Sequence, residues 1–319
     1  MLKKCSKDDC WAPEIACNLG ESDFRVCPHW QGGEADTVQE DSREGVLLPW
    51  SSNSFGTTDV QFIAGRIQPI VIGVVGLHNA GKTSILTALY LLLSQGRKLS
   101  QRLFAGSYTL GGWEHLAHWL RWEAGQIPTF PPHTPHGAGR APGLLHLALR
   151  HTTGSLQDVL FTDAPGEWFQ HWALDEASAD AIGARWVCKF ADAFMLFIDR
   201  EALTGPERGE ARIRIRHLAH RLALHSGARR VALVWSKADI NLPEEQRASL
   251  QRELARLFPF SRSFDVTIHR EALEGVKWDD SLLELYNWVL ERPLMPLGED
   301  LSSKVIRFDD PLLAFRGFK

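Results

Sequence analysis

The sequence predicts an α/β fold in three layers, with helices on both faces of a mostly parallel sheet. Two observations carry this prediction. Short, almost continuous apolar runs recur along the chain, as expected for parallel strands buried on both faces. Helical patterns lie between these runs, and such alternation is typical of a parallel sheet with crossover helices. The chain has 319 residues and is 44% hydrophobic, so it can bury such a core without disulfides.

The expected elements begin at residue 69. The first strand is 69–75 (PIVIGVV), and the helix after it covers 82–95 (KTSILTALYLLLSQ) and ends at Gly96. Later apolar runs predict strands at 143–150, 156–162, 194–198, 231–235 and 264–268. Helical patterns lie at 173–190, 206–226, 244–257 and 280–291.

The chain divides by composition into three parts. They are a cysteine-rich head and linker at 1–57, the α/β domain at 58–292, and a C-terminal tail at 293–319. The domain contains an insert at 96–142 that is long for a loop. Within this insert, Trp113, Leu116 and Leu120 share one face of an expected helix. Packing of this helix on the domain is favoured over docking of a partner or contact with a membrane.

Charge and hydropathy argue against several classes of partner. The net charge is −4, which does not favour nucleic acid or an anionic membrane as the main partner. No apolar stretch approaches the roughly 18 to 20 residues that span a bilayer, and the N-terminal stretch lacks the apolar core of a secretory signal. We therefore expect a cytoplasmic protein with no membrane partner, whose five cysteines stay reduced.

A phosphate-binding loop lies between the first expected strand and its helix. Residues 76–83 read GLHNAGKT, which matches G-x-x-x-x-G-K-[ST]. Glycine allows close approach of the backbone, and successive N–H groups at a helix N-terminus bind anions. Lys82 would reach the β- and γ-phosphates of a nucleotide, and the Thr83 hydroxyl would bind Mg²⁺. The fold is therefore expected to be that of a P-loop NTPase. The nucleotide-binding residues expected here are Gly76, His78, Asn79, Ala80, Gly81, Lys82, Thr83 and Ser84.

Two further motifs follow expected strands, at the carboxyl ends where open α/β sheets bind ligands. Residues 163–166 (DAPG) form a D-x-x-G after strand 156–162, and residues 236–239 (SKAD) form an [NTS]-K-x-D after strand 231–235. A second D-x-x-G, at 180–183, falls inside a helical pattern. The string alone is therefore weak evidence, and the first match gains its value from its order and its strand-end position.

In this order, GLHNAGKTS, DAPG and SKAD resemble a P-loop GTPase of the translation-factor and Ras-like (TRAFAC) class over about residues 66–292. The long insert, the phrase FTDAPGEWF and a cysteine-rich head ending in CPHW are similar to the bacterial double-GTPase proteins of predicted defence or conflict systems.

The resemblance implies a role for each strand-end residue. Asp239 would accept hydrogen bonds from guanine N1 and N2, a demand that adenine cannot meet. Lys237 would lie along the base plane, next to Ser236, which replaces the commoner Asn or Thr. Asp163 would hold Mg²⁺ through a water molecule, and the Gly166 N–H would meet the γ-phosphate and sense its loss.

Two features depart from the pattern of the class. Glu167 stands where many relatives carry a glutamine that orients the attacking water. Its carboxylate is repelled by the γ-phosphate, so unaided hydrolysis is expected to be slow; alternatively, Glu167 polarises the water in a site that a partner completes. The usual loop that contacts guanine O6 cannot be recognised in the sequence. The nearest stretch is 267–270 (TIHR), which includes His269 and Arg270 and where a backbone N–H could serve.

The first switch must supply a threonine for Mg²⁺ from within the insert. Thr134, in a loop rich in Pro, Gly and His, is our choice, and Thr129 and Thr109 are alternatives. Lys82, Glu167 and Thr134 are therefore the expected catalytic residues. Arg140 is either an internal arginine finger or, as we favour, a solvated loop arginine.

The head offers a candidate zinc site. Four cysteines spaced C-x4-C-x6-C-x9-C could bind tetrahedral Zn²⁺, and His29 is an alternative ligand. The other interpretation is a head with free thiols. The four cysteines are Cys5, Cys10, Cys17 and Cys27.

The main functional hypothesis is a GTP-binding molecular switch that slowly hydrolyses GTP to GDP with Mg²⁺. It would act on an effector or activating protein, and the resemblance implies a bacterial defence system. The first alternative is a P-loop ATPase or small-molecule kinase, which explains the missing O6 loop but not Lys237 and Asp239 at a strand end. The second is a nucleotide-stabilised scaffold without catalysis, which Glu167 supports best.

Overall fold

The computed structural model describes residues 6–7, 27–30, 54–65, 67–121, 142–268 and 278–291. The chain divides into two compact units, Met1–Leu47 and Leu48–Lys319. In the described part of the first unit, the Ser6 N–H donates to the carbonyl of His29 (2.9 Å), and the Trp30 N–H donates to the carbonyl of Cys27 (3.0 Å). The boundaries that the sequence suggests for head, domain and tail stay predictions.

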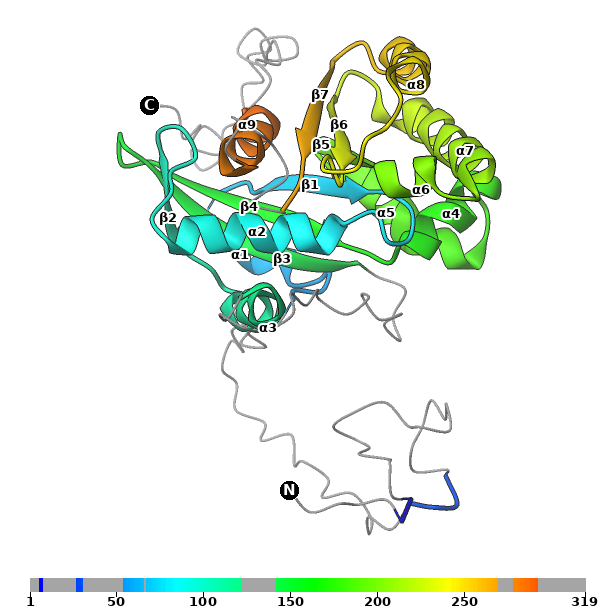
Figure 1. Cartoon of the computed structure of the whole chain (residues 1–319). Coiled ribbons are helices and arrows are strands. Elements are labelled where there is room, and N and C mark those ends of the chain that lie inside the picture. The colour runs from blue at the N-terminus through cyan, green and yellow to red at the C-terminus, as the bar shows by residue number, and fades with distance from the viewer. Residues whose placement is uncertain are drawn as a thin grey trace, which may run out of the picture. The chain divides into compact units, whose positions relative to one another are not determined.

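A sheet forms the centre of the second unit (Figure 1). Among the described residues it has seven strands, in the order β2-β3-β4-β1-β5-β6-β7. They are β1 (Ile70–Val75), β2 (Arg102–Gly106), β3 (Gly143–His151), β4 (Leu156–Asp163), β5 (Ala193–Asp199), β6 (Arg230–Ser236) and β7 (Ser261–Val266). Strand β3 pairs antiparallel with β2 and β4, and the other neighbouring pairs are parallel. The α/β fold with a mostly parallel sheet is confirmed.

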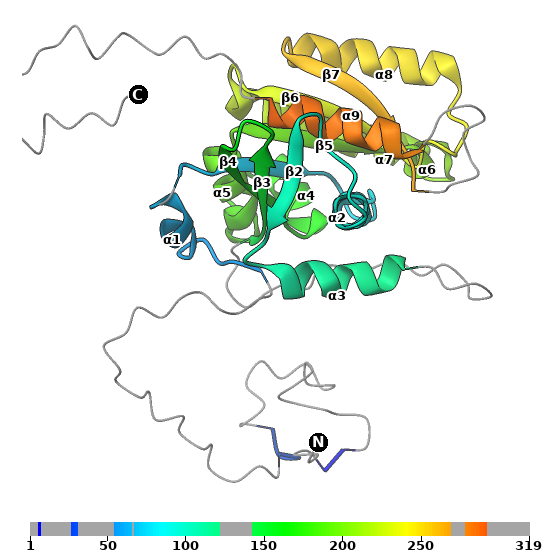
Figure 2. The same cartoon turned by 90° about the vertical axis from the view of Figure 1, so that its left-hand side faces the viewer.

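Helices cover both faces of the sheet (Figure 1, Figure 2). Alternate residues of β1 divide the core, because Ile72 and Val74 join one apolar cluster while Val71 and Val75 join the other. The first cluster includes residues of α2 (Lys82–Ser94), α3 (Leu110–Leu120) and α9 (Trp278–Leu290). The second includes residues of α4 (Gly166–Leu174), α5 (Ile182–Phe190), α7 (Arg208–Ser226) and α8 (Glu244–Leu257). Three short elements complete the described part: α1 (Val60–Ala64), η2 (Ala179–Ala181) and α6 (Arg200–Thr204).

The phosphate-loop helix begins and ends at glycines, as the sequence predicts. Gly81 precedes α2 with a left-handed φ of 79°, and Gly96 follows it with a φ of 82°. After the last turn, the Arg97 N–H donates to the carbonyl of Leu92 at 3.0 Å. Glycine adopts this left-handed conformation without the steric cost of a Cβ, so the helix ends here.

The single helix expected at 173–190 is wrong. The chain instead forms α4, which begins at Gly166, and α5, which begins at Ile182. Between them, the Asp175 carboxylate accepts a hydrogen bond from the N–H of Ala177 (2.9 Å). Short polar side chains that bond to nearby backbone compete with helix formation. Two element boundaries also differ from the expected ones. The helix expected at 206–226 begins at Arg208, and the strand expected at 264–268 is β7, which begins earlier, at Ser261, and ends at Val266.

The described part of the insert adds two elements to the domain. Strand β2, which the sequence did not predict, extends the antiparallel edge of the sheet. Helix α3 packs through Trp113, which is fully buried and stacks on Tyr90 at 5.5 Å. The Trp113 indole N–H also donates to the carbonyl of His146 at 2.8 Å. The packed interpretation of this helix is therefore confirmed. None of the helices in the described ranges combines the length and apolar character that crossing a membrane requires.

Candidate functional site

A cleft of about 510 Å³ opens at the carboxyl ends of the parallel strands. This volume falls in the usual range for small-molecule sites. Its walls come from all three predicted motifs and from the residues after β7. They include residues 78–85, 164–167, 236–237, 239 and 266–268. The structure therefore brings together most of the predicted nucleotide-binding residues, which lie far apart in the sequence.

The phosphate loop owes its shape to two residues with positive φ and to one buried lysine. Asn79 has a φ of 58° and Gly81 a φ of 79°, in the left-handed region that Gly adopts freely and Asn tolerates. The Lys82 ammonium donates to the carbonyls of Gly76 (3.1 Å) and Leu77 (2.8 Å). The side chain is thus folded back along its own loop, at the floor of the cleft.

Lys82 is poised to bind an anion. Its residue is 8% exposed. Burial lowers the pKa of Lys82 from its ordinary value of 10.5 to about 8, although the charges of Asp163 and Glu167 act in the opposite direction. A buried cation without a fully compensating partner attracts negative charge strongly because the local dielectric is low.

Two oxygen ligands of the kind that Mg²⁺ prefers lie side by side at the loop. The Thr83 hydroxyl donates to Oδ1 of Asp163 at 3.2 Å. Magnesium is bound through a few hydroxyl or carboxylate oxygens together with waters and substrate phosphates. These two residues fit the ion and are where it would bind.

The D-x-x-G segment touches the phosphate loop backbone. A Cβ on Gly166 would lie 2.5 Å from the carbonyl carbon of Leu77 and also against the His78 N atom. Any side chain here would force the two segments apart, because these atoms belong to the backbone and cannot turn away. Next to this contact, Nδ1 of His78 lies 2.6 Å from Oε1 of Glu167.

At the other end of the cleft, the Asp239 carboxylate is hydrogen-bonded by a residue that follows β7. The Thr267 hydroxyl donates to Oδ1 of Asp239 at 2.6 Å. Ser236 is buried, and its hydroxyl donates to the carbonyl of Ile198 at 3.4 Å. Asp239 is thus fixed at the rim of the cleft, while Ser236 belongs to the supporting structure beneath it.

Lys237 combines an unusual backbone conformation with ion pairs to two acids. Its φ is 54°. Its ammonium donates to Oδ2 of Asp199 (2.8 Å) and to Oε2 of Glu201 (2.7 Å). Burial by itself would lower the pKa of Lys237, but the hydrogen bonds and charges of the two acids outweigh it and the pKa is raised. The ammonium therefore stays charged while its alkyl stem lines the cleft.

Several predicted site residues lie outside the described ranges. They are Thr134, Thr129, Arg140, His269, Arg270, Cys5, Cys10 and Cys17. Thr109 lies within the described residues, and the prediction that it is a magnesium ligand is wrong. It is fully buried, and its hydroxyl accepts the N–H of His146 at 2.8 Å. Cys27 is buried as a free thiol, and within the described residues no cluster of His, Cys, Asp or Glu could hold a metal ion.

Sequence reasoning missed two residues close to Lys237 and Asp239, namely Arg200 and Glu201, which follow strand β5 directly. Their position directly after a strand could have identified them, as it did for the D-x-x-G and [NTS]-K-x-D motifs. The carboxyl ends of parallel strands share one edge of the sheet, where ligands bind. Thr267, which follows β7, lies in the TIHR stretch that the sequence did single out, but for a backbone N–H and not for its hydroxyl.

Comparisons with known proteins identify a family for this chain. The model of the family described as Double-GTPase 2 matches residues 70–289, more than half of the chain. A comparison with curated proteins found no significant match.

Among solved structures, the chain is similar to Methanosarcina barkeri Roco2 RocCORdC bound to GDP, with 15% identity over 72% of this chain and 51% of that one, at a TM-score of 0.38. It is also similar to a variant of SsGBP, with 14% identity over 73% and 59% of the two chains and a TM-score of 0.35. Era in complex with MgGDPNP and nucleotides of 16S ribosomal RNA gives 16% identity over 69% and 56%, with a TM-score of 0.34. The chain thus spans only a little over half the length of these structures. From the family match, the chain belongs to the Double-GTPase 2 family.

Proposed function

We propose that this chain is a GTP-binding molecular switch that hydrolyses GTP to GDP slowly and signals to a protein partner. One observation carries the proposal: a single cleft has Lys82 at one end and Asp239 at the other. The lysine is the buried cation that a triphosphate needs, and the carboxylate is the acceptor that guanine needs.

The part of the cleft around Asp239, where the base would bind, supports guanine because the Asp239 carboxylate can accept further hydrogen bonds. One of its oxygens already accepts a hydrogen bond from Thr267. A carboxylate has about four lone-pair sites, so it still accepts two N–H groups from guanine. Adenine presents no such pair of donors, so it cannot form the paired hydrogen bonds that a bound guanine would make with this carboxylate.

The phosphate end supports binding of a triphosphate with Mg²⁺. The backbone N–H groups of the loop and the Lys82 ammonium would hold the phosphates in position. Thr83 and Asp163 would hold Mg²⁺, which when bound neutralises charge that develops on the phosphates. Thr134 is proposed as the switch threonine from the sequence alone.

Slow hydrolysis and a partner follow from Glu167. Its carboxylate lies at the mouth of the cleft beside His78, where a bound γ-phosphate repels it. A P-loop GTPase of this type, without an added arginine, is slow, and a partner's arginine adds about 10³ to 10⁵ in rate. We therefore propose that a protein partner completes the site. Zinc in the head, a cytoplasmic location and a role in bacterial defence stay predictions from the sequence.

Nucleotide selectivity tests the proposal. Isothermal calorimetry would measure binding of GTP, ATP and XTP with Mg²⁺ to the wild type, Asp239→Asn and Lys82→Ala. We expect the wild type to prefer GTP, and Asp239→Asn to lose GTP affinity by about 100-fold or more and to gain affinity for XTP. Lys82→Ala should weaken all three nucleotides. A wild type without preference for GTP over ATP, or a Lys82→Ala variant that binds like the parent, would overturn the proposal.

A further inference from the structure

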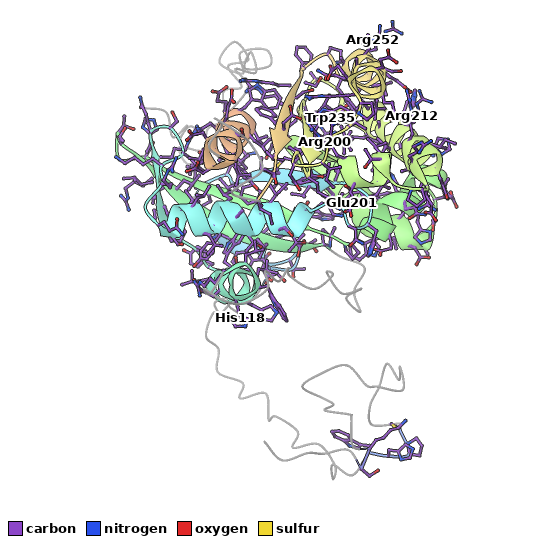
Figure 3. All side chains as sticks on the ribbon, in the orientation of Figure 1. His118, Arg200, Glu201, Arg212, Trp235 and Arg252 are labelled. Carbon is purple, nitrogen blue, oxygen red and sulfur yellow. The ribbon has the colours of Figure 1, made fainter. Side chains whose placement is uncertain are left out.

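Arg200 is a buried charged residue that no predicted motif includes. It is the first residue of α6 and is 8% exposed. Figure 3 labels it together with Glu201 and Trp235. Its position at the end of β5 places it beneath the loop that follows β6, which carries Asp239.

The guanidinium binds that loop through its backbone. Nη1 of Arg200 donates to the carbonyl of Ala238 at 3.2 Å and, more weakly, to that of Ile240 at 3.5 Å. These two residues stand immediately before and after Asp239 in the chain. Fixing the peptide groups on both sides of a residue limits the directions in which its side chain can point.

The other side of the guanidinium is anchored to β7. Nη2 of Arg200 pairs with Asp265, whose second oxygen accepts a hydrogen bond from Nη2 of Arg247 at 2.6 Å. Two residues beyond Asp265, the Thr267 hydroxyl donates to Asp239. Arg200 therefore joins the loop that carries Asp239 to the strand whose end orients the same carboxylate.

The loop at residues 237–240 needs such support because its first residue has a strained backbone conformation. Lys237 has a φ of 54°, a left-handed conformation that costs free energy for any residue other than glycine and persists only where the surroundings impose it. The contacts that impose it include the Ala238 N–H, which donates to the carbonyl of Val266 at 3.1 Å, as well as those of Arg200.

We propose that Arg200 is a positioning residue for base selection: it holds the 237–240 loop so that the Asp239 carboxylate faces the base. This inference rests on the proposed function, because it assumes that Asp239 reads guanine. It predicts that Arg200 affects the discrimination between bases and leaves the binding of the phosphates unchanged, since the guanidinium hydrogen-bonds to the carbonyls of residues 238 and 240 and to Asp265.

The chain offers a matched pair of variants for the test. Arg200→Ala leaves Asp265 paired with Arg247, so no carboxylate is orphaned. Arg247→Ala leaves Asp265 paired with Arg200 and removes no contact to the loop carbonyls. Arg200→Lys keeps the charge but replaces the planar fork by an ammonium. Thermal unfolding would show that each variant is folded.

Affinities for GTP, ITP and ATP with Mg²⁺ provide the readout, because ITP lacks the N2 amino group that Asp239 would bind. We expect Arg200→Ala to reduce the GTP:ITP affinity ratio roughly tenfold, with ATP affinity unchanged. Arg200→Lys should restore part of the ratio, and Arg247→Ala should match the wild type.

Three outcomes would overturn the inference. They are a wild-type GTP:ITP ratio in Arg200→Ala, an equal loss in Arg247→Ala, and a parallel loss of ATP affinity in Arg200→Ala. If Arg200→Ala does not fold, Arg200→Lys decides, and a wild-type ratio in that variant would overturn the inference because an ammonium cannot reproduce the two-sided contact. A wild type that prefers no base would instead overturn the proposed function itself, and the two failures are therefore distinguishable.

Discussion

Nδ1 of His78 lies 2.6 Å from Oε1 of Glu167, and this contact joins the phosphate loop to the D-x-x-G segment at the mouth of the cleft. Both side chains are partly exposed, at 43% and 34%. The imidazole occupies the position from which a proton or a hydrogen bond can offset the charge of the carboxylate. Glu167 therefore faces the cleft as one half of a pair.

The pair predicts opposite effects of two substitutions on binding of a triphosphate. His78→Ala removes the imidazole contact from the Glu167 carboxylate, so repulsion of a γ-phosphate should grow and affinity for a non-hydrolysable GTP analogue should fall about two- to fivefold relative to GDP. Glu167→Gln removes the repelling charge and should raise the same ratio. Calorimetry with both nucleotides measures it, and a double variant that shows the sum of the two single effects would mean that the contact does not couple the residues.

Lys82 predicts a pH dependence of stability in the nucleotide-free and metal-free protein. Its pKa is about 8 in the folded chain and 10.5 when unperturbed. Below pH 8 the folded state carries a buried charge, and between the two values the unfolded state binds more protons, so stability rises with pH. The stability advantage of Lys82→Met over the wild type should therefore shrink by about 2 kcal/mol between pH 7 and pH 9.5.

Urea unfolding at the two pH values measures this difference. The control is Lys98→Met, because Lys98 is exposed and the substitution removes no buried charge. If the difference between Lys82→Met and the wild type is the same at both pH values, the ammonium is not buried as described.

The close packing of Gly166 against the phosphate loop leads to a prediction about steric clash, for which Gly209 provides the control substitution. An added Cβ would meet backbone atoms of Leu77 and His78, so Gly166→Ala must move the segment away from the phosphate loop. We expect a loss of about 1 to 3 kcal/mol in unfolding free energy and a smaller preference for a GTP analogue over GDP. Gly209→Ala meets nothing within 4 Å in helix α7 and should be neutral or stabilising. Equal behaviour of the two variants in thermal unfolding and calorimetry would contradict the contact.

Trp113 predicts that the insert is anchored in the core. Trp113→Ala removes a fully buried ring and its hydrogen bond to the carbonyl of His146, and should cost about 3 to 5 kcal/mol. His118 lies on the exposed face of the same helix (Figure 3), so His118→Ala should change stability by less than about 0.5 kcal/mol. Urea unfolding compares them, and similar costs for the two substitutions would show that α3 does not belong to the core.

Local patterns were sufficient for most of the fold. The strand, loop and helix around Lys82 could be predicted because a buried strand, a glycine turn and an apolar helix that ends at a glycine each leave a short-range signature. The break between α4 and α5 could not, because Asp175 and its neighbours carry residue types that helices tolerate when the side chain turns to solvent. Strand β2 was also missed, since only pairing with β3 makes its half-buried residues a strand.

The sequence by itself determined the class of protein, because G-x-x-x-x-G-K-T, D-x-x-G and S-K-x-D each need only adjacent residues to carry their chemistry. Only the tertiary structure decided which side chains support those motifs. Arg200 lies 65 residues from Asp265 in sequence and His78 lies far from Glu167, yet each pair is in contact. The reason is physical: parallel strands bring their carboxyl ends to one edge of the sheet, and which side chains meet there depends on the register and packing of the whole domain.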